Sequence, residues 1–199
     1  MPEKPFAESC VENRVPILDV LRPRLGGCRN LLEIGSGTGQ HAVYFAADLP
    51  YLSWHTSDRV ENHAGINAWL IDAALPNVQP PIRLDVLRDT WPDIQFDAVF
   101  SANTAHIMPV AEVEAMFSGV GQVLVPGGVF LLYGPFNHGG RFSSASNQRF
   151  DAWLKQRDPA MGIRDLDWLK ALATSCGMDL IEDIEMPVNN RTLVWRRNA

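Results

Sequence analysis

The chain of 199 residues has few cysteines and no long apolar run. Its three cysteines, Cys10, Cys28 and Cys176, are widely spaced and odd in number, which argues against a disulfide framework or a zinc ribbon. We interpret them as reduced thiols. No apolar stretch approaches the roughly 20 residues that cross a bilayer, and residues 1–5 are too polar to begin a secretory signal. We therefore expect a cytoplasmic protein without a membrane segment.

Positive charge is also scarce, with 17 basic and 23 acidic residues and a formal net charge of −6. This balance argues against a general nucleic-acid-binding protein. Residues 1–133 hold 8 basic and 15 acidic side chains, whereas residues 134–199 hold 9 and 8. A mixed solvated surface explains most of this difference, but the arginines of the second half favour a small anionic substrate. The length predicts a single domain, residues 1–199, with a core that needs no disulfides.

The most informative stretch, residues 31–40, reads LLEIGSGTGQ. Its apolar start predicts a short buried strand, and residues 40–47 predict a helix. Between them, Gly35, Gly37 and Gly39 alternate with small polar residues, which is typical of the strand, tight turn and helix that open a doubly wound α/β sheet. Glycine allows backbone angles that a Cβ forbids, and it lets a ligand approach the main chain. The free N–H groups of the helix start would face that ligand.

The spacing of these glycines bears on the ligand. A dinucleotide fingerprint counted from Gly35 would need glycine at Gln40, and one counted from Gly37 would end the strand two residues early. Glu33 would repel a pyrophosphate but could bind a cationic amino-acid group. The stretch resembles the first motif of class I S-adenosylmethionine-dependent methyltransferases. A nicotinamide oxidoreductase and a glycine turn without a ligand are the weaker alternatives.

The rest of the chain predicts alternating strands and helices. A helix is expected over residues 8–25, interrupted by Pro16 so that it could form two short pieces. Five alternating βα units follow, and two closing strands are joined by a link too short for a crossover helix, so the last strand should be antiparallel. We expect a Rossmann-like class I methyltransferase fold: a mostly parallel seven-stranded sheet with helices on both faces. The strands are predicted at residues 31–34, 51–57, 80–84, 96–102, 129–133, 178–185 and 191–195.

Ligands of such sheets lie beyond the carboxyl ends of the strands. Asp58 lies 23 residues after Gly35, where an acid can accept ribose hydroxyls, although it could also cap the next helix. Asp85 could accept the adenine amino group beside Val86, or act only as a turn residue. Asn103 could hold the methionyl ammonium. The predicted cofactor-binding residues are Glu33, Gly35, Ser36, Gly37, Gly39, Gln40, Asp58, Asp85, Val86 and Asn103.

His106 is the main candidate for acid–base chemistry, because its ordinary pKa lies near neutrality and it follows a predicted strand end. It could deprotonate a hydroxyl, thiol or amine, with Tyr133 assisting, or it could be a structural histidine. His41 is interpreted as a helix-surface residue near the cofactor. No His, Cys, Asp or Glu set has metal-ligand spacing, so we predict no metal.

Later segments carry a more specific likeness. They include Glu12-Asn13-Arg14, Tyr133-Gly134-Pro135-Phe136, Ser146-Asn147, Gly162-Ile163-Arg164-Asp165 and Met186-Pro187 before Asn189-Asn190. Through them the chain resembles, nearly end to end, the small methyltransferase-like family long catalogued as a domain of unknown function, relatives of methyltransferase-like protein 26. Cys10-Val11 and Arg59-Val60 depart from that pattern; the second departure weakens the ribose assignment of Asp58.

This resemblance implies S-adenosylmethionine as cofactor, S-adenosylhomocysteine as product, and transfer of a methyl group to an O, N or S atom of a small molecule. Residues 1–27 would form a helical lid, and segments within residues 134–190 a substrate pocket. Asn147, Asn189 and Asn190 could orient a polar acceptor, while Arg141 and Arg164 could hold a carboxylate; structural roles are the alternative for both arginines. A non-catalytic binding module is the second hypothesis. A monomer or homodimer is expected.

Overall fold

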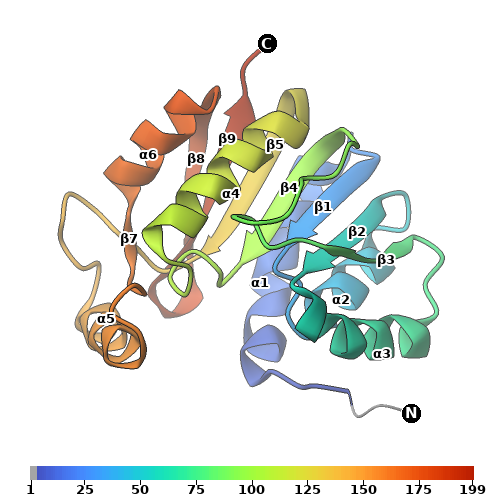
Figure 1. Ribbon diagram of the computed structural model, residues 1–199, viewed down its shortest axis with the longest axis horizontal. Helices are drawn as coiled ribbons and strands as arrows, with labels where there is room; N and C mark the ends of the chain where they lie inside the picture. Colours follow the sequence, from blue (N-terminus) through green and yellow to red (C-terminus); the bar gives the residue numbers. More distant parts are fainter. Residues whose placement is uncertain (1–3) are drawn as a thin grey trace. The chain divides into compact units, whose positions relative to one another are not determined.

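The computed structural model describes residues 4–199, so the start of the predicted lid, residues 1–3, lies outside the described residues. Seven strands form one sheet in the order β3 (Val78–Arg83), β2 (Ser53–Asp58), β1 (Asn30–Ile34), β4 (Phe96–Ala102), β5 (Leu124–Gly134), β9 (Asn190–Arg197) and β8 (Met178–Met186) (Figure 1). The short strands β6 (Phe136–Asn137) and β7 (Arg164–Asp165) pair separately. Parallel pairing joins β1 to β2 and β4, and β2 to β3, whereas β9 runs antiparallel to β5 and β8. The predicted α/β fold with an antiparallel last strand is therefore confirmed.

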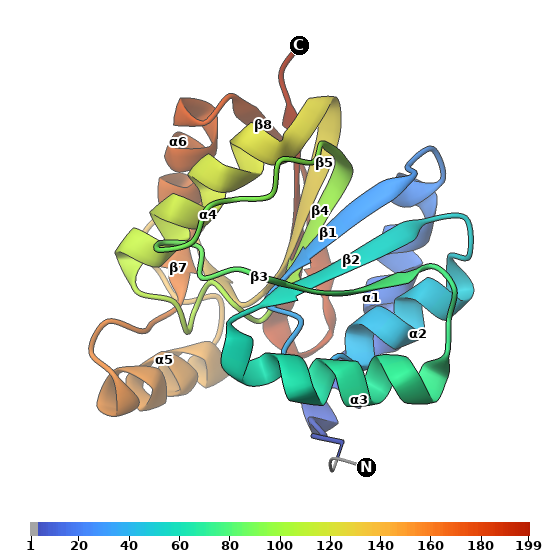
Figure 2. The same cartoon turned by 45° about the vertical axis from the view of Figure 1, so that its right-hand side comes forward.

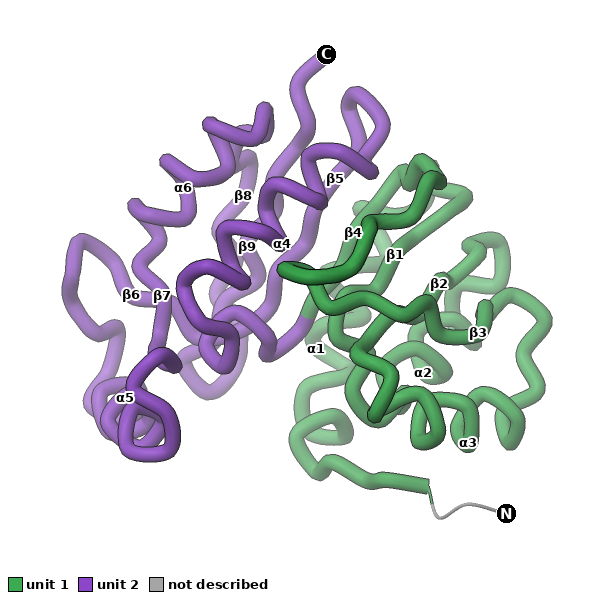
Figure 3. The backbone as a smooth tube through the Cα atoms, viewed as in Figure 1, with its two compact units in different colours: residues 1–101 green, residues 102–199 purple. Residues whose placement is uncertain are grey.

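The chain divides into two compact units, residues 1–101 and 102–199 (Figure 3). In the first unit α1 packs against α2, and α2 against α3 (Figure 2). Between these helices and the strands, the rings of Phe45, Trp54 and Phe100 form a cluster with centroids 5.6–6.0 Å apart. The elements are α1 (Glu8–Leu25), β1 (Asn30–Ile34), α2 (Gln40–Asp48), β2 (Ser53–Asp58), η1 (Val60–Asn62), α3 (His63–Ala73), β3 (Val78–Arg83) and β4 (Phe96–Ala102).

Two details of the first unit differ from the sequence expectations. Helix α1 is continuous although Pro16 and Pro23 lie inside it, so the loss of a helical N–H at Pro16 does not divide it. No helix connects β3 to β4, where residues 84–95 form turns. The Asp89 carboxylate accepts the N–H of Asp85, and that of Asp85 accepts the N–H of Leu87, contacts that compete with helix formation. The expected five βα units are thus one helix short.

The second unit has an aromatic core of its own. Phe117 of α4 packs on Phe130 of β5 and Trp195 of β9, with ring centroids 5.2–5.4 Å apart. Strand β5 begins at Leu124, earlier than predicted, because the glycine pair at 127–128 lies within it. The elements are α4 (Val110–Val123), β5 (Leu124–Gly134), β6 (Phe136–Asn137), α5 (Ala145–Arg157), β7 (Arg164–Asp165), α6 (Leu166–Ser175), β8 (Met178–Met186), η2 (Pro187–Asn189) and β9 (Asn190–Arg197). Within residues 4–199, none of the helices is long and apolar enough to cross a membrane.

Candidate functional site

The glycine turn joins β1 to α2 in the first unit. Gly35, Gly37 and Gly39 have φ angles of 71°, 57° and 90°, a region that side chains disfavour. A Cβ on Gly39 would lie 3.1 Å from the Cα of Ile66, so this glycine allows α3 to approach the turn. A Cβ on Gly37 would have only the Gly35 carbonyl oxygen near it, at 4.0 Å. The main chain at Gly37 is therefore open to a ligand.

Asp58, the last residue of β2, is bonded directly to this turn. Its Oδ2 accepts the N–H of Gly37 at 2.7 Å, while Oδ1 accepts the N–H of Arg59 at 2.7 Å and the Asn62 side chain at 2.8 Å. A carboxylate offers about four acceptor positions, so Oδ2 retains one for a ligand hydroxyl. Asp58 thus organises the segment that follows β2. It is not the N-cap of η1 or α3, whose N-cap residues are Arg59 and Asn62, so the alternative role as a helix cap is not what the structure has.

Asp85 and Val86 follow β3. The Asp85 carboxylate accepts the N–H of Leu87 at 3.1 Å and lies 3.5 Å from the Arg59 guanidinium. Arg59, which departs from the family pattern, thus forms an ion pair with Asp85, the residue predicted to bind adenine. Val86 is buried. The hydrogen bond from the Leu87 N–H is what the alternative interpretation, a turn residue, expects of Asp85.

Glu33 and Ser36 point into the interior. The Glu33 carboxylate accepts hydrogen bonds from Trp54 Nε1 at 3.0 Å and from Ser36 Oγ at 2.9 Å. Ser36 Oγ also accepts the N–H of Ser57. Burial raises the pKa of Glu33 to about 7, against the bonds from Trp54 and Ser36, which lower it. These contacts serve the core beneath the turn, and the expected binding of a cationic ligand group by Glu33 stays a prediction.

The start of the chain is fastened to the same turn. Gln40 Oε1 accepts the N–H of Ala7 at 2.6 Å and the hydroxyl of Thr38 at 3.0 Å. His41 Nε2 lies 2.7 Å from Asn13 Oδ1 of α1. The predicted N-terminal lid segment therefore contacts the predicted cofactor turn within the first unit.

His41 is buried, which corrects its interpretation as a surface residue. Its ring stacks on Phe45 at 5.1 Å, and burial, followed by the charge of Arg14, lowers the pKa of His41 to about 4. A sequence signal existed: His41 and Phe45 are four residues apart and share one face of α2. Its partner Asn13 lies 28 residues away and could not be identified from local pattern.

Asn103 and His106 belong to the second unit. Asn103 has a φ of 59°, and its N–H donates to the Tyr133 carbonyl at 2.9 Å. The side chains of His106 and Tyr133 are buried, and the His106 ring meets Phe150 edge to face at 5.2 Å. Burial, with a smaller effect from the Arg164 charge, lowers the pKa of His106 to about 4. The imidazole is neutral at pH 7 and is a weak base.

Arg164 holds the segment that carries His106. Its Nε donates to the Ala105 carbonyl at 3.0 Å, and its Nη2 donates to the carbonyls of Ala160 and Met108. In addition, the N–H of Gly162 donates to the His106 carbonyl at 2.9 Å. The guanidinium is thus engaged with main-chain carbonyls, as the structural alternative expected, although no ion pair with the adjacent Asp165 is involved. Arg141 is exposed. The contacts of Arg164 therefore remove one basis for the expected anionic acceptor, and the carboxylate-binding role of Arg141 stays a prediction.

The three predicted asparagines come together around the turn between β8 and β9. Buried Asn147 donates to Ser143 Oγ at 2.8 Å and to the Asn189 carbonyl at 3.0 Å. Asn189 and Asn190 line a cavity of about 370 Å³, whereas Asn147 holds its wall in place. The remaining lining residues are Ser143, Glu185, Met186, Val188 and Arg191. Across residues 4–199, no three His, Cys, Asp or Glu side chains are placed to hold a metal ion.

Several solved structures that are similar to this chain in fold are described as methyltransferases. An O-methyltransferase family protein from Burkholderia thailandensis has a TM-score of 0.84 at 15% identity, covering 96% of this chain and 58% of that one. The S-adenosylmethionine-dependent methyltransferase SibL has 0.81 at 18%, covering 96% and 56%. Human N-acetylserotonin methyltransferase, solved with S-adenosylmethionine, has 0.80 at 16%, covering 96% and 53%. The chain spans little more than half the length of these proteins. Residues 4–197 match the family model described as "Protein of unknown function (DUF938)".

Proposed function

The chain belongs to the DUF938 family, proteins of unknown function with a methyltransferase fold, and for this member we propose S-adenosylmethionine-dependent methyl transfer to a small molecule. The observation that carries the proposal is the bond from the Gly37 N–H to Asp58. This bond places the Asp58 carboxylate, which can accept a further hydrogen bond, next to the main chain of Gly37, where no side chain beyond the adjacent residues lies within 4 Å of the position of a Cβ. An acid at the end of the second strand is suited to bind ribose hydroxyls.

The residues of the first unit fit the nucleoside part of this cofactor. In the proposal Oδ2 of Asp58 accepts a ribose hydroxyl, and the open main chain at Gly37 accommodates the cofactor. Val86 supplies apolar contact for the adenine, and Asp85 accepts its amino group in exchange for part of its interaction with Arg59. Bound S-adenosylmethionine would supply a methyl group on a sulfonium, which is an activated leaving group.

The weak basicity of His106 limits the kinds of methyl acceptor that the protein could use. An efficient general base has a pKa near the working pH, and His106 lies well below it. We therefore infer a nucleophile that carries no proton at pH 7, or one that it loses easily, such as a carboxylate oxygen, a thiol or an unprotonated nitrogen. With S-adenosylmethionine bound, the nucleophile would displace the sulfonium sulfur from the methyl carbon, and S-adenosylhomocysteine would be the leaving group. Any proton released would pass to solvent.

A binding module that holds the cofactor or its product without transferring a methyl group is the second candidate. The same low pKa of His106 favours it, because the second unit then offers a poor proton acceptor. The two candidates predict the same cofactor affinity and differ in turnover, so binding is measured first and methyl transfer to candidate acceptors second.

The test is calorimetric titration with S-adenosylmethionine, S-adenosylhomocysteine and NADPH. Asp58→Asn should weaken binding of the first two by tenfold or more, because it removes a charged hydrogen bond to a hydroxyl. Asp97→Asn is the matched control, since Asp97 likewise accepts two main-chain N–H groups, at Arg29 and Asn30, at the start of the sheet. It should bind as the unaltered protein does. Binding of NADPH alone, or of none of the three, contradicts the proposal.

A further inference from the structure

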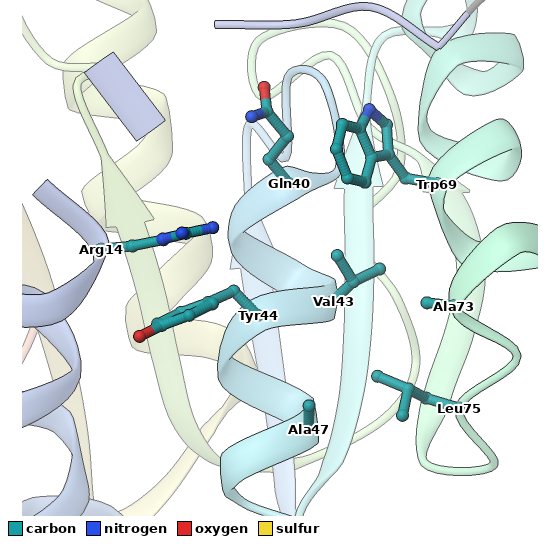
Figure 4. A pocket seen from close by; sticks show the side chains of 8 residues that line it. All are labelled: Arg14, Gln40, Val43, Tyr44, Ala47, Trp69, Ala73 and Leu75. Carbon is teal, nitrogen blue, oxygen red and sulfur yellow. The ribbon is translucent and has the colours of Figure 1, made fainter. Parts of the chain in front are cut away.

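A second pocket lies on the helical side of the first unit, between α1, α2 and α3. It has a volume of about 320 Å³, within the range of small-molecule sites. Val43 of α2 lies at its centre, with Arg14 and Tyr44 on one side and Trp69, Ala73 and Leu75 on the other (Figure 4). Gln40 and Ala47 complete the lining. Most of this surface is apolar, and its strongest polar group is Arg14.

The Arg14 guanidinium is held in place but is not satisfied. Its central carbon lies 4.5 Å from the centroid of the Tyr44 ring, so the two groups stack. Figure 4 shows the guanidinium extending over that ring toward Val43. Its Nε is buried and has no hydrogen-bond acceptor among the described residues. A buried donor without a partner costs free energy, and no described neighbouring side chain offsets the charge of this guanidinium. Because Nε is enclosed, a ligand would meet Arg14 through the outer part of the guanidinium, where this residue lines the pocket.

The opposite wall is formed by Trp69, which contacts the segment before α1. Trp69 Nε1 donates to the Pro5 carbonyl at 2.7 Å, and the ammonium of Lys4 lies 4.5 Å from the ring centroid. Lys4 is itself paired with Asp72 at 2.6 Å. The indole is thus fixed by the segment before α1, and the charge of Lys4 is already matched by a carboxylate. The unsatisfied cation of the pocket is Arg14.

We propose that this pocket binds a small planar organic anion, of the aromatic carboxylate class. The carboxylate pairs with the outer part of the Arg14 guanidinium, and the ring lies across Val43 between Trp69 and Leu75. Apart from Gln40, none of the lining residues belongs to the predicted cofactor set, so the site is distinct from that of the proposed cofactor. The inference holds whether or not the protein transfers methyl groups.

The test uses indole-3-acetate as the probe and the neutral indole-3-acetamide as its matched control. Nitrogen-15 NMR follows the indole N–H of Trp69 and the Nε–H of Arg14 during each titration. We expect saturable shifts of both signals by the acid at up to millimolar concentration, and at least tenfold weaker binding of the amide. Equal binding of acid and amide, or no saturable shift, would overturn the proposal.

Two variants separate the charge from the shape of the pocket. Arg14→Gln removes the cation, and Ala73→Leu fills the pocket while leaving Arg14 in place; each should abolish saturable binding. Arg22→Gln changes an exposed arginine of the same helix outside the pocket and should bind the acid normally. Thermal unfolding and the amide spectrum show that each variant is folded. Binding retained by a folded Arg14→Gln or Ala73→Leu protein places the ligand elsewhere and refutes the site.

Discussion

Trp54 Nε1 donates a 3.0 Å hydrogen bond to the buried carboxylate of Glu33. The bond lies beneath the glycine turn, where Trp54 also meets Phe45 and Phe100. The acidic residue of the glycine motif therefore stabilises the base of the turn, and its protonation depends on the folded core.

The first prediction concerns pH. Because burial raises the pKa of Glu33 from 4.5 to about 7, the folded protein keeps a proton that the unfolded chain releases between these values. The contribution of Glu33 to the free energy of unfolding should therefore fall by about 3 kcal/mol as the pH rises through this window. His41 and His106, whose folded pKa values lie near 4, contribute in the opposite direction, so the quantity compared is the difference between the unaltered protein and Glu33→Gln at each pH. Glu33→Gln, whose amide oxygen can accept both bonds without ionising, should lose this dependence. Urea unfolding at pH 5 and pH 8 measures it, with exposed Glu61→Gln as control. Parallel pH profiles for Glu33→Gln and the unaltered protein would contradict the prediction.

The second prediction distinguishes two glycines of the turn. Gly37→Ala should lower the free energy of unfolding by about 1–2 kcal/mol, because alanine is unfavourable in the left-handed conformation. It should also weaken S-adenosylhomocysteine binding at least tenfold, because the added Cβ would occupy the open space where we propose that the ligand lies. Gly39→Ala should cost more stability, since its Cβ would also meet Ile66 at 3.1 Å. Denaturant unfolding and calorimetry measure the two effects. Normal binding by Gly37→Ala would show that a ligand does not approach the turn there.

The third prediction concerns Arg164. Lysine at this position keeps the charge but cannot donate to the carbonyls of Ala105, Met108 and Ala160 together. Arg164→Lys should destabilise the protein by about 3 kcal/mol and speed amide exchange at Gly162, whose N–H bonds to His106. Exposed Arg141→Lys should change stability by no more than about 0.5 kcal/mol. Comparable stabilities for the two variants would mean that the carbonyl contacts of Arg164 contribute little.

The fourth prediction uses backbone strain. Val188 is 82% exposed and has a φ of 60°, which is unfavourable for a β-branched residue. Val188→Gly should therefore raise the free energy of unfolding by about 1 kcal/mol, because little packing is lost and the strain is relieved. Val60→Gly, at a 62% exposed valine of η1, should lower it instead. Thermal or urea unfolding gives both signs, and a loss of stability in both variants would argue against strain at Val188.

The sequence by itself determined the parts of this protein that depend on local order. The first strand, turn and helix could be predicted because their signals all lie within residues 31–47: an apolar run before Gly35, alternating glycines, and a helical pattern after Gly39. The short link at 187–189 likewise requires an antiparallel closing strand, since no crossover fits in it. The local sequence pattern also predicts where β2 and β4 end, at Asp58 and Ala102.

Only the tertiary structure decided what the polar side chains contact. Arg164 bonds to a carbonyl 59 residues away, and His41 meets Asn13 across 28 residues, so no periodicity of the sequence contains these pairs. The same holds for Glu33, whose partner Trp54 comes from the neighbouring strand. Acid and arginine residues can bind ligands or satisfy main-chain groups with the same chemistry. Which of these occurs depends on the atoms that folding brings within hydrogen-bond distance.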